Sequence, residues 1–191
     1  MPARHAEPRS RAARNSFDKK IFVRESLSVR AKRCIYPLVE YARKGEGLER
    51  NFISDILDKS SEVEAFGKIQ ERKHLLNISY RGKDDIRRDY FPDFVIKTKE
   101  KMYLVETKSE DEIQKAEGNE KALIVLKAKA AISWCKTASK VVLENQPPEW
   151  EYFVLSEKTF EDNKQLSFDG LVSLGRLDTE RLIASESGKL F

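Results

Sequence analysis

The sequence predicts a domain of mixed α/β or α+β class. Three observations predict this class: helical apolar spacing comes first, a run of apolar strand-like segments follows, and an alanine-rich helical segment leads to one more strand. The 191 residues suffice for one ordinary domain with some extra length. No apolar run approaches the roughly 18 residues of a membrane span, so no membrane partner is expected.

The first third of the chain combines a basic tail with two helical patterns. Residues 1–20 are rich in Pro, Arg and Ser and are expected to be disordered, with an Arg-rich transit peptide as the alternative. Residues 28–47 have apolar positions near helical spacing, with Pro37 as a kink or boundary. Residues 47–61 predict a better helix, whose apolar stripe contains Leu48, Phe52, Ile53, Ile56 and Leu57.

The middle of the chain changes to the period of strands. Residues 62–70 and 74–82 predict strands, and residues 82–89 form a polar turn region. The two strongest strand patterns are 90–98 and 101–109. Both are apolar on their two faces, so we expect these strands to be covered on both sides.

The second half predicts a helix and a further strand. Residues 110–119 are expected to form a surface linker, and residues 119–139 a helix with Asn119 as its N-cap. Residues 149–156 predict the last clear strand.

The domain boundaries follow from this pattern. A disordered basic tail covers 1–20, the main domain covers 21–160, and a C-terminal extension over 161–191 either packs on the domain or is partly disordered. From residue 157 onward the pattern is ambiguous, with a short helix and a strand near 166–175.

Composition excludes several classes of protein. The net charge of +4 is a mild basic excess that permits an anionic partner. Cys34 and Cys135 lie far apart, and only two histidines are present, so neither a disulfide framework nor a Cys/His zinc site is expected. The N-terminus lacks the apolar core of a secretory signal, and we expect a cytoplasmic protein.

Three charged side chains interrupt the two strongest strands. A hairpin that turns at 99–100 would place Asp93 directly opposite Glu106, with their Cβ atoms about 4.5–5.5 Å apart. Side chains alternate along a strand, so Lys108 would share the face of Glu106. The geometry therefore predicts that two carboxylates and an ammonium point the same way.

Two carboxylates so close in apolar surroundings repel each other, so one takes up a proton or a cation lies between them. Mg²⁺ prefers such oxygen ligands, can polarise a phosphoryl oxygen and lowers the pKa of a bound water. Lys108 would lie near that water or near the charge that builds up on a phosphate. These groups suit metal-assisted phosphodiester hydrolysis. The alternative is a structural Asp93–Lys108 salt bridge between strands.

The segment "DYFPDFVIKT…MYLVETK" resembles the PD-(D/E)XK nuclease core. Together with "GLERNFISDILDKSSEVEAFGKI" and "LKAKAAISWC", over about 45–156, it resembles the C-terminal endonuclease domain of the Res subunit of type III restriction–modification enzymes. The resemblance implies a restriction-endonuclease-like fold, with a mixed sheet of about four strands flanked by helices. It also implies DNA cleavage with Mg²⁺, for which Mn²⁺ can substitute.

The resemblance assigns roles to single residues. Asp93, Glu106 and Lys108 would be catalytic, and the metal contacts would come from Asp93, Glu106, Thr107 and Glu49. Glu49 is alternatively an exposed surface residue. The implied partners are double-stranded DNA, a methyltransferase subunit and a separate helicase or translocase, because the chain has no G-x-x-x-x-G-K-[ST] motif. The chain would be a fragment, a truncated gene product or a free-standing relative.

Two basic groups are candidates for phosphate contacts. They are Arg81, Lys83, Arg87 and Arg88, just before Asp93, and Lys121, Lys127 and Lys129, on the helix after the motif. The alternative for the lysines is an ordinary solvated helix face, and Asp84 and Asp85 partly cancel the arginines.

Three functions follow from these observations. The first is a Mg²⁺-dependent endodeoxyribonuclease, the cleavage domain of a type III-like restriction system without the helicase motor. The second is a repair, recombination or mobile-element nuclease of the same fold. The third is a catalytically inactive DNA-binding remnant.

Overall fold

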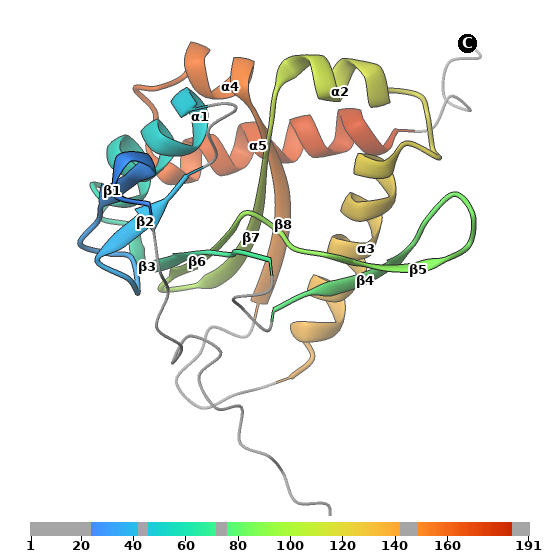
Figure 1. The fold of residues 1–191 in the computed structure, drawn as a ribbon, viewed down its shortest axis with the longest axis horizontal. Helices are drawn as coiled ribbons and strands as arrows, with labels where there is room; N and C mark the ends of the chain where they lie inside the picture. The colour runs from blue at the N-terminus through green and yellow to red at the C-terminus, as the bar shows by residue number, and fades with distance from the viewer. Residues whose placement is uncertain (1–23, 42–45, 72–75, 142–148, 185–191) are drawn as a thin grey trace, which may run out of the picture.

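A computed structural model describes residues 24–41, 46–71, 76–141 and 149–184. Its centre is a four-stranded sheet in the order β3-β6-β7-β8, in which β8 runs parallel to β7 and the other pairs are antiparallel (Figure 1). The strands are β3 (Val63–Lys68), β6 (Phe94–Thr98), β7 (Lys101–Lys108) and β8 (Glu149–Ser156). The predicted mixed α/β class, with a mixed four-stranded sheet flanked by helices, is confirmed. The predicted tail over 1–20 lies outside the described residues.

The β6–β7 hairpin has the register expected from its sequence. Phe94 pairs with Val105, and Lys97 pairs with Met102. The Thr98 hydroxyl closes the turn, because it donates to the Lys101 carbonyl and accepts from the Lys101 N–H, both at 3.1 Å.

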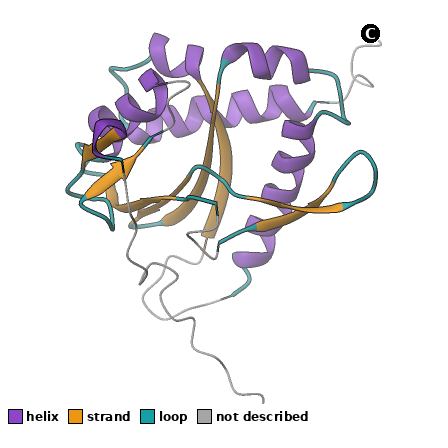
Figure 2. Ribbon diagram, viewed as in Figure 1, coloured by secondary structure: helices purple, strands orange, loops and turns teal. Residues whose placement is uncertain are grey.

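Helices cover both faces of the sheet (Figure 2). One face packs against α1 (Glu46–Asn51), the π-helical turn η2 (Phe52–Leu57), α4 (Glu157–Asp162) and α5 (Phe168–Ile183). The other face packs against α2 (Glu110–Ala116) and α3 (Leu123–Ala138), with the end of α5. Residues on both faces of β7 are fully buried as a result, among them Leu104 and Val105. The predicted helix over 47–61 and the strands over 62–70, 101–109 and 149–156 are confirmed within one or two residues at most ends.

Two small hairpins lie outside the central sheet. The first pairs β1 (Ser28–Arg30), which follows the turn η1 (Glu25–Leu27), with β2 (Leu38–Glu40). The helix predicted over 28–47 is therefore wrong: Pro37 cannot continue a helix, and the β-branched residues of this segment pair across the hairpin instead.

The second hairpin pairs β4 (Ile78–Arg81) with β5 (Arg87–Tyr90) and lies beside α3 (Figure 1). The turn between these strands is shorter than the region predicted over 82–89, because Arg87 and Arg88 already pair with Arg81 and Tyr80.

In three other segments the structure differs from the prediction, and the capping residues of the helices explain the difference. Residues 110–119 contain α2 instead of a linker, because Ser109 and Glu112 form a reciprocal capping box. The next helix begins at Leu123 with Ala122 as N-cap, and the Asn119 side chain instead accepts from the Lys121 N–H in the preceding turn. The strand predicted near 166–175 belongs to α5, whose N-cap is Ser167.

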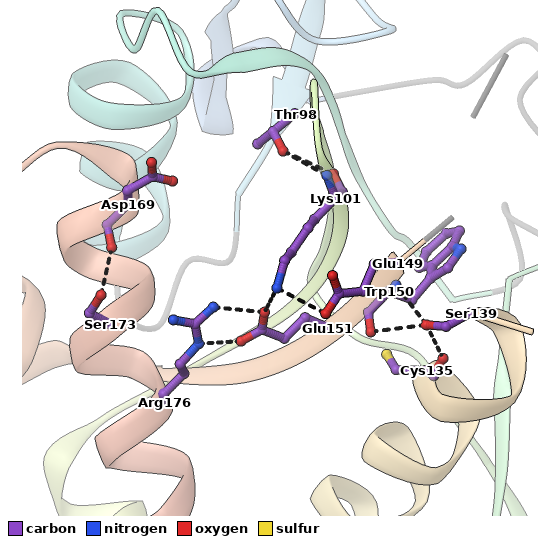
Figure 3. A network of polar contacts seen from close by, with 10 residues as sticks. All are labelled: Thr98, Lys101, Cys135, Ser139, Glu149, Trp150, Glu151, Asp169, Ser173 and Arg176. Atoms are coloured by element: carbon purple, nitrogen blue, oxygen red, sulfur yellow. Dashed lines mark hydrogen bonds and ion pairs between the residues drawn. The ribbon is translucent and has the colours of Figure 1, made fainter. Parts of the chain in front are cut away.

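Helix α5 is fixed to the sheet by polar and apolar contacts. The Arg176 guanidinium binds Glu151 of β8, and Glu151 also binds Lys101 of β7, which reaches Glu149 as well (Figure 3). One turn later, Asp178 accepts from the Ser156 N–H at 3.0 Å and the Thr179 hydroxyl accepts from the Val154 N–H at 2.7 Å. These bonds lie where the end of the sheet meets the helix.

No helix in the described part of the chain is long and apolar enough to cross a membrane.

Helix α5 lies close against the sheet at Gly175. A Cβ atom there would lie 2.4 Å from Cδ2 of the fully buried Phe153. Gly175→Ala is expected to lower the free energy of unfolding by about 1–3 kcal/mol, because the core is overpacked. Urea unfolding measures this. Gly47→Ala is the matched control, since a Cβ atom there would have nothing within 4 Å, and it is expected to stabilise α1 by up to about 1 kcal/mol. Equal effects of the two changes would contradict the prediction.

Candidate active site

The candidate site lies at one end of the central sheet. Asp93 directly precedes β6, and Glu106 and Lys108 lie near the end of β7. Lys68 ends β3 next to Phe94, and Glu49 comes from α1. The central strands thus bring together residues that are up to 59 positions apart in the sequence.

Glu106 is the buried centre of the site, with 4% of its surface exposed. Its Oε1 accepts from the Lys108 ammonium at 2.8 Å, and its Oε2 accepts from the Tyr90 hydroxyl at 2.7 Å. The Tyr90 hydroxyl also lies 3.3 Å from that of Tyr152. The sequence does not predict the two tyrosines as site residues, although Tyr90 lies three positions before Asp93.

The charge on Glu106 is disfavoured in this environment. Burial, and then the neighbouring Asp93 carboxylate, raise the pKa of Glu106 to about 7. Burial also opposes the charge of Lys108, but the Glu106 carboxylate outweighs this and the pKa of Lys108 is raised. Lys108 is therefore a cation at neutral pH, while Glu106 is poised between its two protonation states.

Asp93 is oriented by the neighbouring strand. Its Oδ2 accepts from both the N–H and the hydroxyl of Thr107, each at 2.8 Å. Thr107 is a metal contact in the expectation from the resemblance, and in the structure its hydroxyl is directed to Asp93. These two bonds leave Oδ1 of Asp93 directed toward Lys68, with 4.0 Å between Oδ1 and Nζ.

Lys68 and Glu49 form a second charged pair beside Asp93. The Lys68 ammonium lies 2.8 Å from Oε1 of Glu49, and about 10% of each side chain is exposed. The same ammonium lies over the Phe94 ring, 4.8 Å from its centroid. The sequence places Glu49 in the site but does not identify Lys68. The available indication is that Lys68 is the one lysine of β3 and ends that strand.

The ion pairs differ from the structural alternative derived from the sequence. Lys108 pairs with Glu106 and approaches Glu112 at 3.9 Å, whereas Asp93 approaches Lys68. Glu106 and Lys108 share a face of β7, as strand alternation predicts. Asp93 stands before the first residue of β6, so the predicted position directly opposite Glu106 is not part of the strand pairing, and its carboxylate accepts from Thr107 instead.

The donor chemistry of the site fits a hard divalent cation. Asp93 and Glu106 supply carboxylate oxygens, and their mutual repulsion is relieved when a cation binds between them. Mg²⁺ is usually held by one or two carboxylates with several waters. In the described ranges, no group of three or more His, Cys, Asp or Glu side chains is arranged to hold a metal. Two carboxylates, with waters to complete the coordination shell, match the way in which proteins usually bind Mg²⁺.

The predicted DNA-binding residues are divided between two environments. Several are engaged with nearby side chains: Arg81 with Asp85, Arg88 with Asp84, Arg87 with Ser79, and Lys129 with Glu120. Lys121 is exposed on the turn before α3. Lys83 and Lys127 line a pocket that also includes Lys108. Arg81 and Arg88 are thus paired with aspartates, whereas the charge of Arg87 meets only a neutral hydroxyl. Among the pocket lysines, Lys108 is paired with Glu106, and Lys83 and Lys127 have no acidic partner among the described residues.

The raised pKa of Glu106 predicts a pH-dependent stability. Glu106 binds its proton more tightly in the folded state, so its contribution to stability is fully present below its ordinary pKa of 4.5 and is lost as pH rises through about 7. The loss is about 3 kcal/mol. Urea unfolding in EDTA from pH 4.5 to 8 measures it, and Glu106→Gln is expected to remove this part of the pH dependence. Parallel profiles of the two proteins would contradict the prediction.

Comparisons with protein-family models, curated proteins and solved structures found no match to this chain.

Proposed function

We propose that this protein is a Mg²⁺-dependent endodeoxyribonuclease with a restriction-endonuclease-like fold and a PD-(D/E)XK active site. The observation that carries the proposal is Glu106, a buried carboxylate held between the Lys108 ammonium and the Asp93 charge at the end of the sheet. A buried carboxylate destabilises the protein unless a cation compensates its charge. Carboxylates with pKa values shifted in this way are common at functional sites. Support comes also from the β6–β7 register, which pairs Phe94 with Val105, so that Asp93, directly before β6, lies near Glu106 of β7.

Each side chain has a definite role in this proposal. Asp93 and Glu106 hold the metal, and Thr107 fixes the orientation of the Asp93 carboxylate through its N–H and hydroxyl. A bound Mg²⁺ supplies a Lewis acid for the phosphoryl oxygen and makes a water more acidic. Lys108 stays protonated at neutral pH, so it donates hydrogen bonds to the attacking water or to the negative charge that develops on the phosphate.

The remaining groups support the two metal ligands. Tyr90 donates to Glu106 and keeps one oxygen of the carboxylate in place. The Lys68–Glu49 pair balances charge on the other side of Asp93, so Glu49 acts on the site through Lys68. Mn²⁺ suits the same oxygen ligands and is expected to substitute for Mg²⁺.

The substrate in this proposal is double-stranded DNA, cut by the cleavage domain of a type III-like restriction system. The basic excess of the chain and the lysines beside Lys108 suit a phosphate backbone. A methyltransferase subunit and a separate helicase or translocase would supply recognition and translocation.

The test is plasmid cleavage by the purified protein with Mg²⁺ or Mn²⁺, against the same protein in EDTA. Nicked or linear product that depends on the metal is the expected result. If the protein cuts nothing alone, the assay is repeated with the methyltransferase and motor subunits of a type III system. The absence of cleavage in both settings would overturn the proposal and favour a non-catalytic DNA-binding role.

A further inference from the structure

A pocket of about 400 Å³ lies next to Lys108, between α2, α3 and the tip of the β4–β5 hairpin. Its walls carry four lysines, Lys83, Lys108, Lys115 and Lys127, and one acid, Glu112. This excess of positive charge indicates that the pocket binds an anionic ligand.

Lys108 is paired with Glu106, but the other three lysines of the pocket are only weakly neutralised by the protein. Lys83 is exposed and has no hydrogen bond or ion pair with any residue that the structure describes. Lys115 is 3.9 Å from Asp111 in an exposed i,i+4 pair, which contributes little. Lys127 has its ammonium over the Tyr90 ring, 5.2 Å from the centroid. These three ammonium groups remain able to bind phosphate.

The rest of the wall is apolar. It consists of Ala116, Ala122, Leu123 and Ile124, with Asn119 at its edge. Leu123 is 49% exposed although it is a large apolar side chain. An apolar wall with lysines around it fits a ligand that has both a flat apolar part and a phosphate, and the volume lies in the range of small-molecule sites.

The pocket is physically continuous with the candidate active site. Lys108 belongs to both, and Tyr90, which donates to Glu106, also carries the Lys127 ammonium on its ring. A group bound in the pocket is therefore adjacent to the phosphodiester that Lys108 would contact.

The geometry points to a binding site for one unpaired nucleotide of the DNA strand that is cut. Its phosphate binds Lys83, Lys115 and Lys127, and its base packs on Leu123 and Ile124. This inference rests on the proposed nuclease function, because it takes the substrate to be DNA. A paired base cannot reach such a pocket without leaving its stack, so the site selects duplex DNA with an unpaired nucleotide beside the cut.

The test measures DNA binding in EDTA, where no cleavage occurs. A negative result therefore bears on the nucleotide site, whereas the nuclease proposal is tested by the cleavage assay. Fluorescence polarisation compares a blunt duplex, the same duplex with a short single-stranded tail, and a free mononucleotide as competitor. The tailed duplex is expected to bind about 10-fold more tightly than the blunt one, as stacking of one base and a phosphate contact allow. Lys83→Gln and Lys127→Gln are each expected to reduce this preference several-fold and to lower the salt slope by about 0.7.

Lys136→Gln is the matched control, because Lys136 is an exposed lysine on α3 that does not line the pocket. It is expected to leave the preference for the tail unchanged. Equal binding of tailed and blunt duplexes, no binding of either, or equal effects of Lys136→Gln and Lys83→Gln would overturn the inference. If the free mononucleotide displaced the tailed duplex at an equal concentration, the inference would also be overturned, because the site would then bind a free nucleotide. Lys115→Gln repeats the measurement if either pocket variant fails to give the circular dichroism spectrum of the wild type.

Discussion

Asp93→Asn is expected to lower the rate of Mg²⁺-dependent DNA cleavage by about 1,000-fold or more while the protein remains folded. Asparagine keeps an oxygen that can accept from Thr107, so the bonds that orient residue 93 can persist. What is lost is the negative charge beside Glu106, and with it much of the affinity for the metal. Loss of about 4 kcal/mol of transition-state stabilisation, the order supplied by a catalytic metal, corresponds to this rate.

The measurement combines the cleavage rate at saturating Mg²⁺ with calorimetric titration of Mg²⁺ into each protein. Asp162→Asn is the matched control. Asp162 and Lys164 repeat the acid-x-lysine spacing of Glu106 and Lys108, but Asp162 is the last residue of α4, its side chain is 59% exposed, and Lys164 follows the helix. It is expected to cut at the wild-type rate. Cleavage by Asp93→Asn at the same rate would show that Asp93 is not part of the catalytic machinery.

The sequence predicts correctly those features of the candidate site that depend on local strand geometry. A two-residue turn and strand alternation determine the register of β6 and β7, and they determine which side chains of β7 share a face. Glu106 and Lys108 are two positions apart on one strand, so their contact follows from the period of the strand alone. Apolar residues on both faces of these strands likewise predict helices on both sides.

The parts that the sequence does not predict depend on contacts between distant segments. Lys68 joins the site because β3 pairs with β6, and no feature of residues 62–70 specifies that partner. The Tyr90–Tyr152 contact joins β5 to β8 across 62 positions. Tertiary pairing of this kind overrides local patterns, as it also does where residues 28–47 form a hairpin.

Lys68→Met is expected to lower the free energy of unfolding of the metal-free protein by about 3–5 kcal/mol. The change removes a buried ammonium that lies 2.8 Å from the Glu49 carboxylate and 4.0 Å from the Asp93 carboxylate. Removing one member of a buried ion pair is costly, because the carboxylate that remains loses the Coulomb energy that offset its desolvation. Urea unfolding in EDTA at pH 7 measures the effect.

Two further variants separate burial from the mere loss of a charge. Lys97→Met removes an ammonium from β6 that pairs with Glu64 at 3.2 Å, but both side chains of that pair are more than a third exposed. Its expected cost is below about 1 kcal/mol, as for other surface pairs. The double variant Lys68→Met/Glu49→Leu removes both members of the pair and is expected to recover part of the stability lost in Lys68→Met, since the buried Glu49 charge is removed as well. If Lys68→Met cost no more than Lys97→Met, the Lys68–Glu49 pair would be exposed to solvent in solution, and the charge balance proposed for Asp93 would be wrong.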